Sequence, residues 1–268
     1  MPEGDNILRS ATVLGPELTG RKLDALFLHD RGEITELHGK SVESVRAVGK
    51  HLLIAIEGGW TLRVHLGMHG TWRRRHRLES PGPRVTVRLV TGDVQYICAR
   101  SYRAELVKTA ALRQHPMVGR LGPDLLAEPP DIDEAVRRAR IAGYANREIG
   151  ELVLDQRVAA GIGNIYKSET LFECRVHPRT RLHQLDEAQV RAIFEKAAAL
   201  MRLNLLIRRH RNVPLRRREE APSTKRLWVY MRKGKPCLDC GTPIERILQG
   251  DHGRSTYFCP NCQRLPEA

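Results

Sequence analysis

The sequence has few aromatic residues, no long apolar run and fewer acidic than basic side chains. Aromatic residues make up 5% of the 268 positions, which argues against an extended groove that binds single strands by base stacking. Apolar runs such as 52–56 end well short of the ~18 to 20 residues that a membrane-spanning helix needs. The opening Met-Pro-Glu-Gly-Asp lacks the basic and apolar segments of a secretion signal. We therefore expect a cytoplasmic protein.

Basic residues outnumber acidic ones, 45 to 31, which gives a net charge of +14. Each Lys or Arg that binds a phosphate releases a condensed counterion, so such an excess is typical of nucleic-acid binding. The alternative is a basic surface for solubility or for an acidic protein partner. Arginine-rich runs at 73–77, 208–211 and 216–218 suit phosphate contact, although each could equally be a solvated loop. The scarcity of aromatic residues makes a duplex the expected ligand.

The N-terminal part of the chain has the pattern of one helix followed by strands. Apolar residues from Ile7 to Leu18 follow helical spacing, with Asp5 available as the cap and Gly15-Pro16 as an interruption. Short β-branched or alternating segments then follow, separated by Gly-rich and Pro-rich turns, at 51–56, 61–66, 84–90 and 94–98. This pattern predicts antiparallel strands. We expect an N-terminal β-rich domain over residues 1–118.

The second half has helical patterns. Residues 119–133 are rich in Gly, Pro and Asp, a composition that ends strands and starts helices, so we expect a linker there. Helices are predicted at 147–156 and 164–174, and a long amphipathic one should follow Asp186 as its cap. We therefore expect an all-α domain over 134–226 that ends in a basic loop, 208–226, and a separate tail over 227–268.

That tail carries two Cys-x2-Cys pairs separated by 18 residues. The four cysteines are Cys237, Cys240, Cys259 and Cys262. Pairs at this spacing are typical of a tetrahedral Zn²⁺ site with four thiolate ligands, which leaves no open coordination position. The alternative, a pair of disulfides, needs an oxidising compartment. We predict one structural zinc, and we expect Cys98 and Cys174 to be small buried apolar residues.

Arg254 lies between the two cysteine pairs, next to the segment Ser-Thr-Tyr-Phe. A hairpin there would present Arg254 at its turn, where it could bind a phosphate or enter a groove. The alternative is a solvated surface arginine.

Three segments, taken in order, resemble the formamidopyrimidine-DNA glycosylase and endonuclease VIII family of base-excision repair enzymes. They are Pro2-Glu3-Gly4-Asp5, the central Leu154-Asp155-Gln156 to Gly161-Ile162-Gly163-Asn164, and the four-cysteine tail. The resemblance covers nearly the whole chain. It implies an α+β fold: an N-terminal helix plus an antiparallel β-sandwich domain, then an all-α helix-two-turns-helix domain with a C-terminal zinc finger. It also implies that duplex DNA binds in the cleft between the domains.

The resemblance assigns the chemistry to the N-terminus. Removal of Met1 would leave Pro2 with a free secondary amine, and an α-amino group with a pKa near 8 is partly neutral at physiological pH. Such an amine can form a Schiff base with the sugar, after which elimination cleaves the strand. Glu3 matches the family's proton donor. The implied activity is a bifunctional DNA glycosylase and abasic-site lyase that removes oxidised bases.

The resemblance also implies contacts to the DNA. Lys50 matches the family's lysine at the lesion, a proton donor and phosphate contact, and Arg254 matches the zinc-finger arginine that binds a phosphate. Asn164 lies at a turn before a predicted helix, where it could hold a phosphate, act as a plain helix cap, or do both. A flipped nucleotide leaves a gap that a wedge must fill. Met68 matches the family's wedge position, and Tyr102 or Arg103 could supply the other wedge residues.

Gly4-Asp5 favours the endonuclease VIII branch, as does the absence of the Gly-Gly-Thr-Thr segment of the guanine branch. Leu66-Gly67-Met68 instead resembles the guanine branch. We therefore expect excision mainly of oxidised pyrimidines, with 8-oxoguanine and formamidopyrimidine lesions as the alternative. A rival of another class is a non-catalytic zinc-containing DNA-binding protein, which would not need Pro2 and Glu3. We expect a monomer that is associated with the nucleoid.

Overall fold

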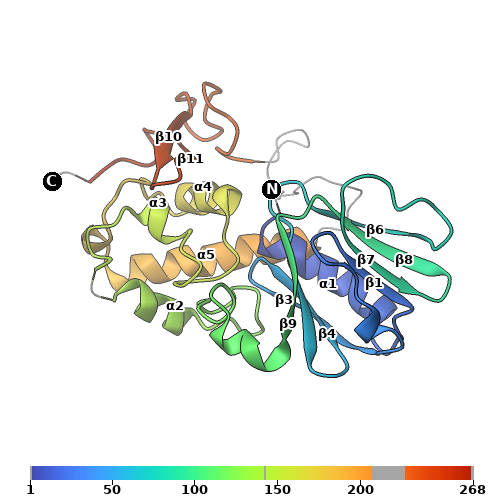
Figure 1. The fold of residues 1–268 in the computed structure, drawn as a ribbon. Coiled ribbons are helices and arrows are strands. Elements are labelled where there is room, and N and C mark those ends of the chain that lie inside the picture. The colour runs from blue at the N-terminus through green and yellow to red at the C-terminus, as the bar shows by residue number, and fades with distance from the viewer. Residues whose placement is uncertain (1, 142, 207–226, 267–268) are drawn as a thin grey trace. The chain divides into compact units, whose positions relative to one another are not determined.

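A computed structural model describes residues 2–141, 143–206 and 227–266, so the arginine runs at 208–211 and 216–218 and the predicted basic loop lie outside the described residues. Internal contacts divide the chain into two compact units, residues 1–120 and residues 121–268 (Figure 1). Among the helices of the described ranges, none combines the length and apolar composition that crossing a bilayer requires.

The first unit begins with helix α1 (Gly4–Leu18). The helix starts two residues earlier than a cap at Asp5 would place it, because the carbonyl of Glu3 accepts the first hydrogen bonds, from the N–H groups of Asn6 and Ile7. Asp5 is therefore not the cap; it lies buried in the first turn, where a carboxylate is favourable near the positive end of the helix dipole. Pro16 does not interrupt the helix, because in the last turn a proline removes only one hydrogen bond and the apolar face stays buried.

Two antiparallel sheets follow α1, with strand orders β2-β1-β7-β8-β6 and β3-β4-β5-β9. The first contains β1 (Ala25–Leu28), β2 (Gly32–Glu33), β6 (Thr71–His76), β7 (Val85–Thr91) and β8 (Val94–Ala99). The second contains β3 (Val42–Val48), β4 (His51–Ile56), β5 (Trp60–His65) and β9 (Arg103–Lys108). Helix α1 packs on β3 and β4, and apolar side chains from α1 and both sheets share one core. The mixed fold that the sequence predicted is confirmed for this unit.

The arginine run at 73–77 forms most of edge strand β6 and is not a solvated loop. Trp72 packs against the core and fixes this strand, while Arg74 pairs with Glu17 on α1 at 3.1 Å. A strand of this composition was not apparent from the sequence, because only one of its six residues is apolar.

The second unit is helical until its last two strands. It contains α2 (Ile132–Ala139), α3 (Ile149–Leu152), α4 (Asn164–Glu173), α5 (Glu187–Leu206), β10 (Glu245–Gln249) and β11 (Arg254–Phe258). Asp186 caps α5 as expected, since its Oδ1 accepts from the N–H of Gln189 at 2.7 Å. The helix predicted at 147–156 is shorter, because the carboxylate of Asp155 binds the N–H and guanidinium of Arg157 and turns the chain there.

A buried polar network lies on the face of the second sheet that points away from the apolar core. Arg63 donates from Nε to Glu105 Oε1 at 2.5 Å and from Nη1 to His51 Nδ1 at 2.8 Å. Glu105 Oε1 also lies 2.9 Å from His115 Nε2. Because a guanidinium can only donate, His51 Nδ1 must carry no proton. The network therefore fixes His51 in its neutral form.

The same environment keeps a second histidine neutral. Burial, aided by the charge of Arg63, lowers the pKa of His51 to about 3. The ring of His65 lies 5.1 Å from that of His51, and burial, aided by the charge of Lys50, lowers the pKa of His65 to about 4. Near pH 6.5, histidines in an unfolded chain take up protons. At that pH both side chains are still neutral in the folded chain.

These lowered pKa values predict how stability depends on pH. The unfolded chain binds more protons than the folded chain below pH 6.5, so the free energy of unfolding should fall as pH decreases towards 5, by up to ~1.4 kcal/mol per pH unit for each histidine. His51→Gln keeps an acceptor for Arg63 and removes one titrating group. Between about pH 7 and pH 5 it should lose roughly 2 kcal/mol less than the original chain in urea unfolding. The exposed His69→Gln is the control, and an unchanged pH slope for His51→Gln would contradict the assignment.

Candidate functional site

The two predicted catalytic residues lie where α1 begins. Pro2 is half-buried, and Glu3 is fully buried with its backbone in an extended conformation as the N-terminal cap of the helix. The backbone hydrogen bonds to Asn6 and Ile7 fix the position of Glu3. Pro2 is therefore followed directly in the chain by a residue whose side chain is buried and whose backbone is fixed.

The register of the second sheet brings two further predicted residues, Lys50 and Arg103, to one end of it. Val48 lies opposite His51, His51 opposite His65, and His65 opposite Arg103, so these four residues form one row across the sheet. Lys50 lies in the turn just before this row, in the hairpin between β3 and β4.

Met68 and Tyr102 leave the sheet at the same row. Met68 follows His65 by three residues and Tyr102 precedes Arg103, and their side chains are 62% and 81% exposed. The ring of Tyr102 packs edge-on against His65, with centroids 5.8 Å apart. Gly67 has φ of 64°, and a Cβ there would lie 2.6 Å from the Cβ of Tyr102. Only glycine allows this approach, so Gly67 lets the turn that carries Met68 pass close to Tyr102.

Arg103, the alternative wedge residue, has a partner within the sheet. Its Nε lies 3.4 Å from Glu105 Oε2, on the carboxylate that also holds Arg63. This ion pair directs Arg103 along the sheet. The arrangement therefore favours Tyr102 over Arg103 as a side chain that could enter a duplex.

Arg100, which was not predicted as a site residue, lies on the same turn as Tyr102. Its backbone is left-handed, with φ of 58°, and its side chain is exposed. Its N–H donates to the carbonyl of Arg84, a second left-handed arginine, at 3.0 Å. Non-glycine residues rarely adopt this conformation, and such strain is often found at functional sites. An arginine gives no sequence signal for it, because left-handed turns are expected at Gly or Asn.

In the second unit, Asn164 is the first residue of α4 and follows the capping residue Gly163. Asn164 is therefore not the helix cap. The side chain of Gln156 holds the preceding turn: its Nε2 donates to the carbonyl of Ile162 at 3.0 Å, and its Oε1 accepts from the N–H of Gly161 at 3.1 Å. The N–H groups at the start of a helix favour anions, so Asn164 lies where a phosphate could bind.

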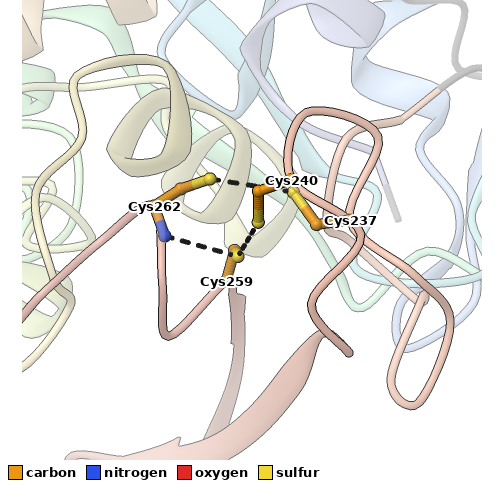
Figure 2. A group of neighbouring side chains, drawn as sticks. All are labelled: Cys237, Cys240, Cys259 and Cys262. Carbon is orange, nitrogen blue, oxygen red and sulfur yellow. Dashed lines mark hydrogen bonds between the residues drawn. The ribbon is translucent and has the colours of Figure 1, made fainter.

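The four tail cysteines converge on one point, as Figure 2 shows. All four Sγ atoms lie within 4.8 Å of one another, with 3.9 Å between Cys237 and Cys262 and 3.5 Å between Cys240 and Cys259. A tetrahedron with Zn–S bonds of ~2.3 Å has edges of about 3.8 Å. The residues therefore suit one four-coordinate zinc ion, and the predicted structural zinc is confirmed.

The other two cysteines lie elsewhere in the chain. Cys98 is buried in the core of the first unit, and burial raises the pKa of its thiol to about 12. Cys174 is half-buried, so it is less enclosed than expected, although burial still raises the pKa of its thiol to about 11. Neither thiol is ionised at neutral pH, which suits packing and not reactivity.

Arg254, exposed at the start of β11, is carried on the hairpin that β10 and β11 form. The tail is attached to α4 through Glu169, whose carboxylate accepts from the N–H groups of residues 228–230 at 2.8 to 3.1 Å. The tail that presents Arg254 is therefore hydrogen-bonded, at residues 228–230, to α4, the helix that also carries Asn164.

Three family models match successive parts of the chain. The formamidopyrimidine-DNA glycosylase N-terminal domain matches residues 1–104, the H2TH domain of the same enzymes matches residues 121–210, and the zinc finger found in FPG and IleRS matches residues 234–265.

Curated relatives match over nearly the full length. The "Probable endonuclease 8 2" of Streptomyces coelicolor is 37% identical, over 99% of this chain and 95% of the relative. The "DNA-(apurinic or apyrimidinic site) lyase Nei2" of Mycolicibacterium smegmatis is 33% identical, over 98% of this chain and 99% of the relative. Among solved structures, the MutM (Fpg) protein from Thermus thermophilus matches with a TM-score of 0.81 and 30% identity, over 99% of this chain and 100% of that one. The chain belongs to the formamidopyrimidine-DNA glycosylase and endonuclease VIII family.

Proposed function

We propose that this protein is a DNA glycosylase and abasic-site lyase of base excision repair that acts mainly on oxidised pyrimidines in duplex DNA. The observation that carries the proposal is the pair Pro2 and Glu3 at the start of α1, with the carboxyl group buried beside the terminal residue, in a chain of this family. A DNA-binding protein without catalysis would have no use for that pair.

The proposed chemistry begins once Met1 has been removed. The amine of Pro2 attacks the sugar C1′, a C–N bond forms, and the glycosidic bond breaks so that the base leaves with its electron pair and takes up the proton that the amine loses. Glu3 donates a proton as the sugar ring opens at C1′–O4′, which leaves an iminium ion at Pro2. The iminium acidifies the C2′ proton, whose loss expels the 3′ phosphate and cleaves the strand. Hydrolysis of the iminium then restores the amine.

Three residues are proposed to hold phosphates around the flipped nucleotide. Lys50 lies at the sheet end that also carries Met68 and Tyr102, which suits a proton donor or phosphate contact at the lesion. Asn164 and the N-terminus of α4 suit a second phosphate. Arg254 suits a third. The zinc ion would fold the tail that carries Arg254, and since all its ligand positions are taken by thiolates, it has no part in the chemical steps.

We propose that Met68 and Tyr102 fill the gap that the flipped base leaves. Their exposure and the close approach of Gly67, the neighbour of Met68, to Tyr102 support this role. Arg103 would remain with Glu105, whereas Arg100 is placed by its left-handed backbone on the turn that carries Tyr102 and could reach a base edge or a phosphate.

A second candidate is excision of 8-oxoguanine and formamidopyrimidine lesions. The segment Leu66-Gly67-Met68 favours it, and a relative from Desulfitobacterium hafniense that is 29% identical bears the name "Formamidopyrimidine-DNA glycosylase". Gly4-Asp5 and the endonuclease 8 names of two relatives favour oxidised pyrimidines. In either case we propose a monomer that works on nucleoid DNA, because one chain supplies every proposed residue.

The reaction can be tested by borohydride trapping on duplexes that contain an abasic site, 5-hydroxyuracil, thymine glycol or 8-oxoguanine. We expect a covalent adduct at Pro2 with all substrates that are processed, and the order of the four yields identifies the branch. The control is a chain with an uncleaved N-terminal extension, in which the Pro2 nitrogen is an amide and cannot attack. A chain with Met1 verifiably absent that gives no adduct on any duplex would refute the enzymatic function.

Glu3→Gln tests the separate role of the carboxyl group. The variant should retain cleavage of a preformed abasic site far better than excision of a base. In base excision the sugar ring opens at C1′–O4′ with the proton that Glu3 donates, whereas a preformed abasic site reaches its ring-opened form without that proton, and the amine of Pro2 is unchanged. General acid–base catalysis is typically worth ~10²- to 10⁴-fold, so base excision should fall by at least about 100-fold. Single-turnover rates on the two substrates measure this, and equal losses would contradict the role assigned to Glu3.

Tyr102→Ala tests the wedge. Excision from a fully paired duplex should fall by about tenfold or more, since flipping costs a few kcal/mol that the wedge offsets, while cleavage of an abasic site in single-stranded DNA should change little. Fluorescence of 2-aminopurine opposite the lesion reports the flipping step. Arg103→Ala should lose less than Tyr102→Ala, and Met117→Ala, at another exposed apolar side chain, is the control. A greater loss for Arg103→Ala would reverse the assignment.

A further inference from the structure

The hairpin of β10 and β11, here called the zinc hairpin, is attached to the helical part of the second unit by a buried glutamine. This residue, Gln249, lies directly opposite Arg254. In the ladder of β10 and β11, Gln249 pairs with Arg254. The Gln249 side chain is buried, unlike that of Arg254, which is exposed. The two residues sit on adjacent strands at the same rung, so the position of one backbone determines that of the other.

Every hydrogen-bonding group of the Gln249 amide is used. Its Nε2 donates to Glu148 Oε2 at 2.6 Å and to the carbonyl of Pro178 at 3.0 Å. Its Oε1 accepts from the hydroxyl of Thr256 at 2.5 Å. Thr256 belongs to β11 and Glu148 immediately precedes α3, so one side chain bonds both strands of the hairpin to the helical part of the unit.

The helical unit has a matching space for this amide. Gly150, within α3, has no side chain, and a Cβ there would lie 2.4 Å from Gln249 Oε1 and 2.9 Å from its Nε2. The neighbouring residue of the hairpin, Gly250, donates its N–H to Glu151 Oε1 at 3.1 Å. The amide therefore packs against the backbone of α3 at Gly150. The turn beside Arg254 is hydrogen-bonded to the same helix through Glu151.

We propose that Gln249 is a positioning residue for Arg254: its buried amide fixes the rung of the zinc hairpin from which Arg254 reaches a DNA phosphate. The proposal rests on the function proposed above for Arg254. Zinc folds the end of the hairpin where the four cysteines meet, but the rung of Arg254 is oriented by Gln249, Glu148 and the space at Gly150. Loss of the amide would leave zinc bound and the arginine present but no longer directed at the phosphate.

The first test measures affinity for an abasic-site duplex at several salt concentrations, using the full chain with bound zinc. Gln249→Ala should weaken binding by about tenfold, as should Arg254→Ala, because a hydrogen bond to a charged group is lost in each case. The slope of log affinity against log salt should fall by ~0.9 in both, the value of one phosphate contact. Combining the two substitutions should add nothing to either alone, whereas a general loss of stability would add to the effect of Arg254→Ala.

Two further substitutions disturb the same contact in different ways, one by crowding the amide and one by replacing it with a carboxylate. Gly150→Ala should displace Gln249 and reproduce its loss of affinity and salt slope. Gln249→Glu should bring two carboxylates together at Glu148 and weaken binding, and adding Glu148→Gln should restore a donor and acceptor pair and recover part of the affinity. These variants keep the test decisive if Gln249→Ala itself fails to fold.

Two controls separate positioning from zinc binding. Leu248→Ala, at an exposed position on the same strand, should change neither affinity nor salt slope. Gln263 is a buried glutamine that also bonds the tail to the helical unit, through the carbonyl of Val176, but it accepts from the N–H of Cys259. Gln263→Ala should therefore lower zinc content, whereas all Gln249 variants should retain one zinc per chain.

The outcomes separate this inference from the proposed function. If Arg254→Ala weakens binding but Gln249→Ala and Gly150→Ala do not, the positioning role is wrong and the phosphate contact stands. If the losses of Gln249→Ala and Arg254→Ala simply add, Gln249 acts only through stability and the inference is also wrong. If Arg254→Ala changes nothing, the phosphate contact proposed for Arg254 fails, and the role of Gln249 fails with it.

Discussion

A buried polar side chain has to find hydrogen-bond partners, because leaving one unpaired costs about 1 to 3 kcal/mol. This requirement recurs behind the proposed functional residues. Arg63, itself bonded to Glu105, holds His51, in the row of residues that runs from Val48 to Arg103. The Gln156 amide holds the turn before Asn164, and the Gln249 amide holds the rung of Arg254. The turns and strand ends that carry the proposed functional residues are thus fixed by buried hydrogen bonds, and few other side chains could make the same bonds.

The same contacts qualify the meaning of the net charge of +14. Several arginines are held by carboxylates within the chain: Asp155 binds Arg147 and Arg157, and Asp239 binds Arg175. Those guanidinium groups stabilise turns, and they are less available to DNA than a count of charges implies. Specific contacts are proposed for few cations, and the remaining excess would supply the salt-sensitive attraction to undamaged DNA.

The sequence predicted those elements whose pattern follows burial. Four strands with alternating or β-branched residues and the capped helix α5 lie within a residue or so of their predicted bounds. Strand β6 was not predicted because its arginines give no alternation of apolar and polar residues. Helix α3 was predicted too long because Asp155 and Gln156 fit a helical pattern, although their side chains bond the turn that follows the helix. The left-handed backbone of Arg100 and the row from Val48 to Arg103, which brings Lys50 and Tyr102 to one end of the sheet, depend on strand register, which no local pattern contains.

In the tail, zinc fixes the local fold of the cysteine turns and hydrogen bonds fix the direction of the hairpin. Four thiolates around one ion fix the local fold of the cysteine turns whatever lies beside them, but a metal at that end leaves the direction of the hairpin undetermined. Direction requires contacts with the helical part, and they come from Glu169, Gln263 and Gln249, each of which bonds backbone groups across the boundary. A phosphate contact needs its donor within a few tenths of an ångström. The position of Arg254 therefore depends on the glutamine opposite it as much as on the ion that folds the tail.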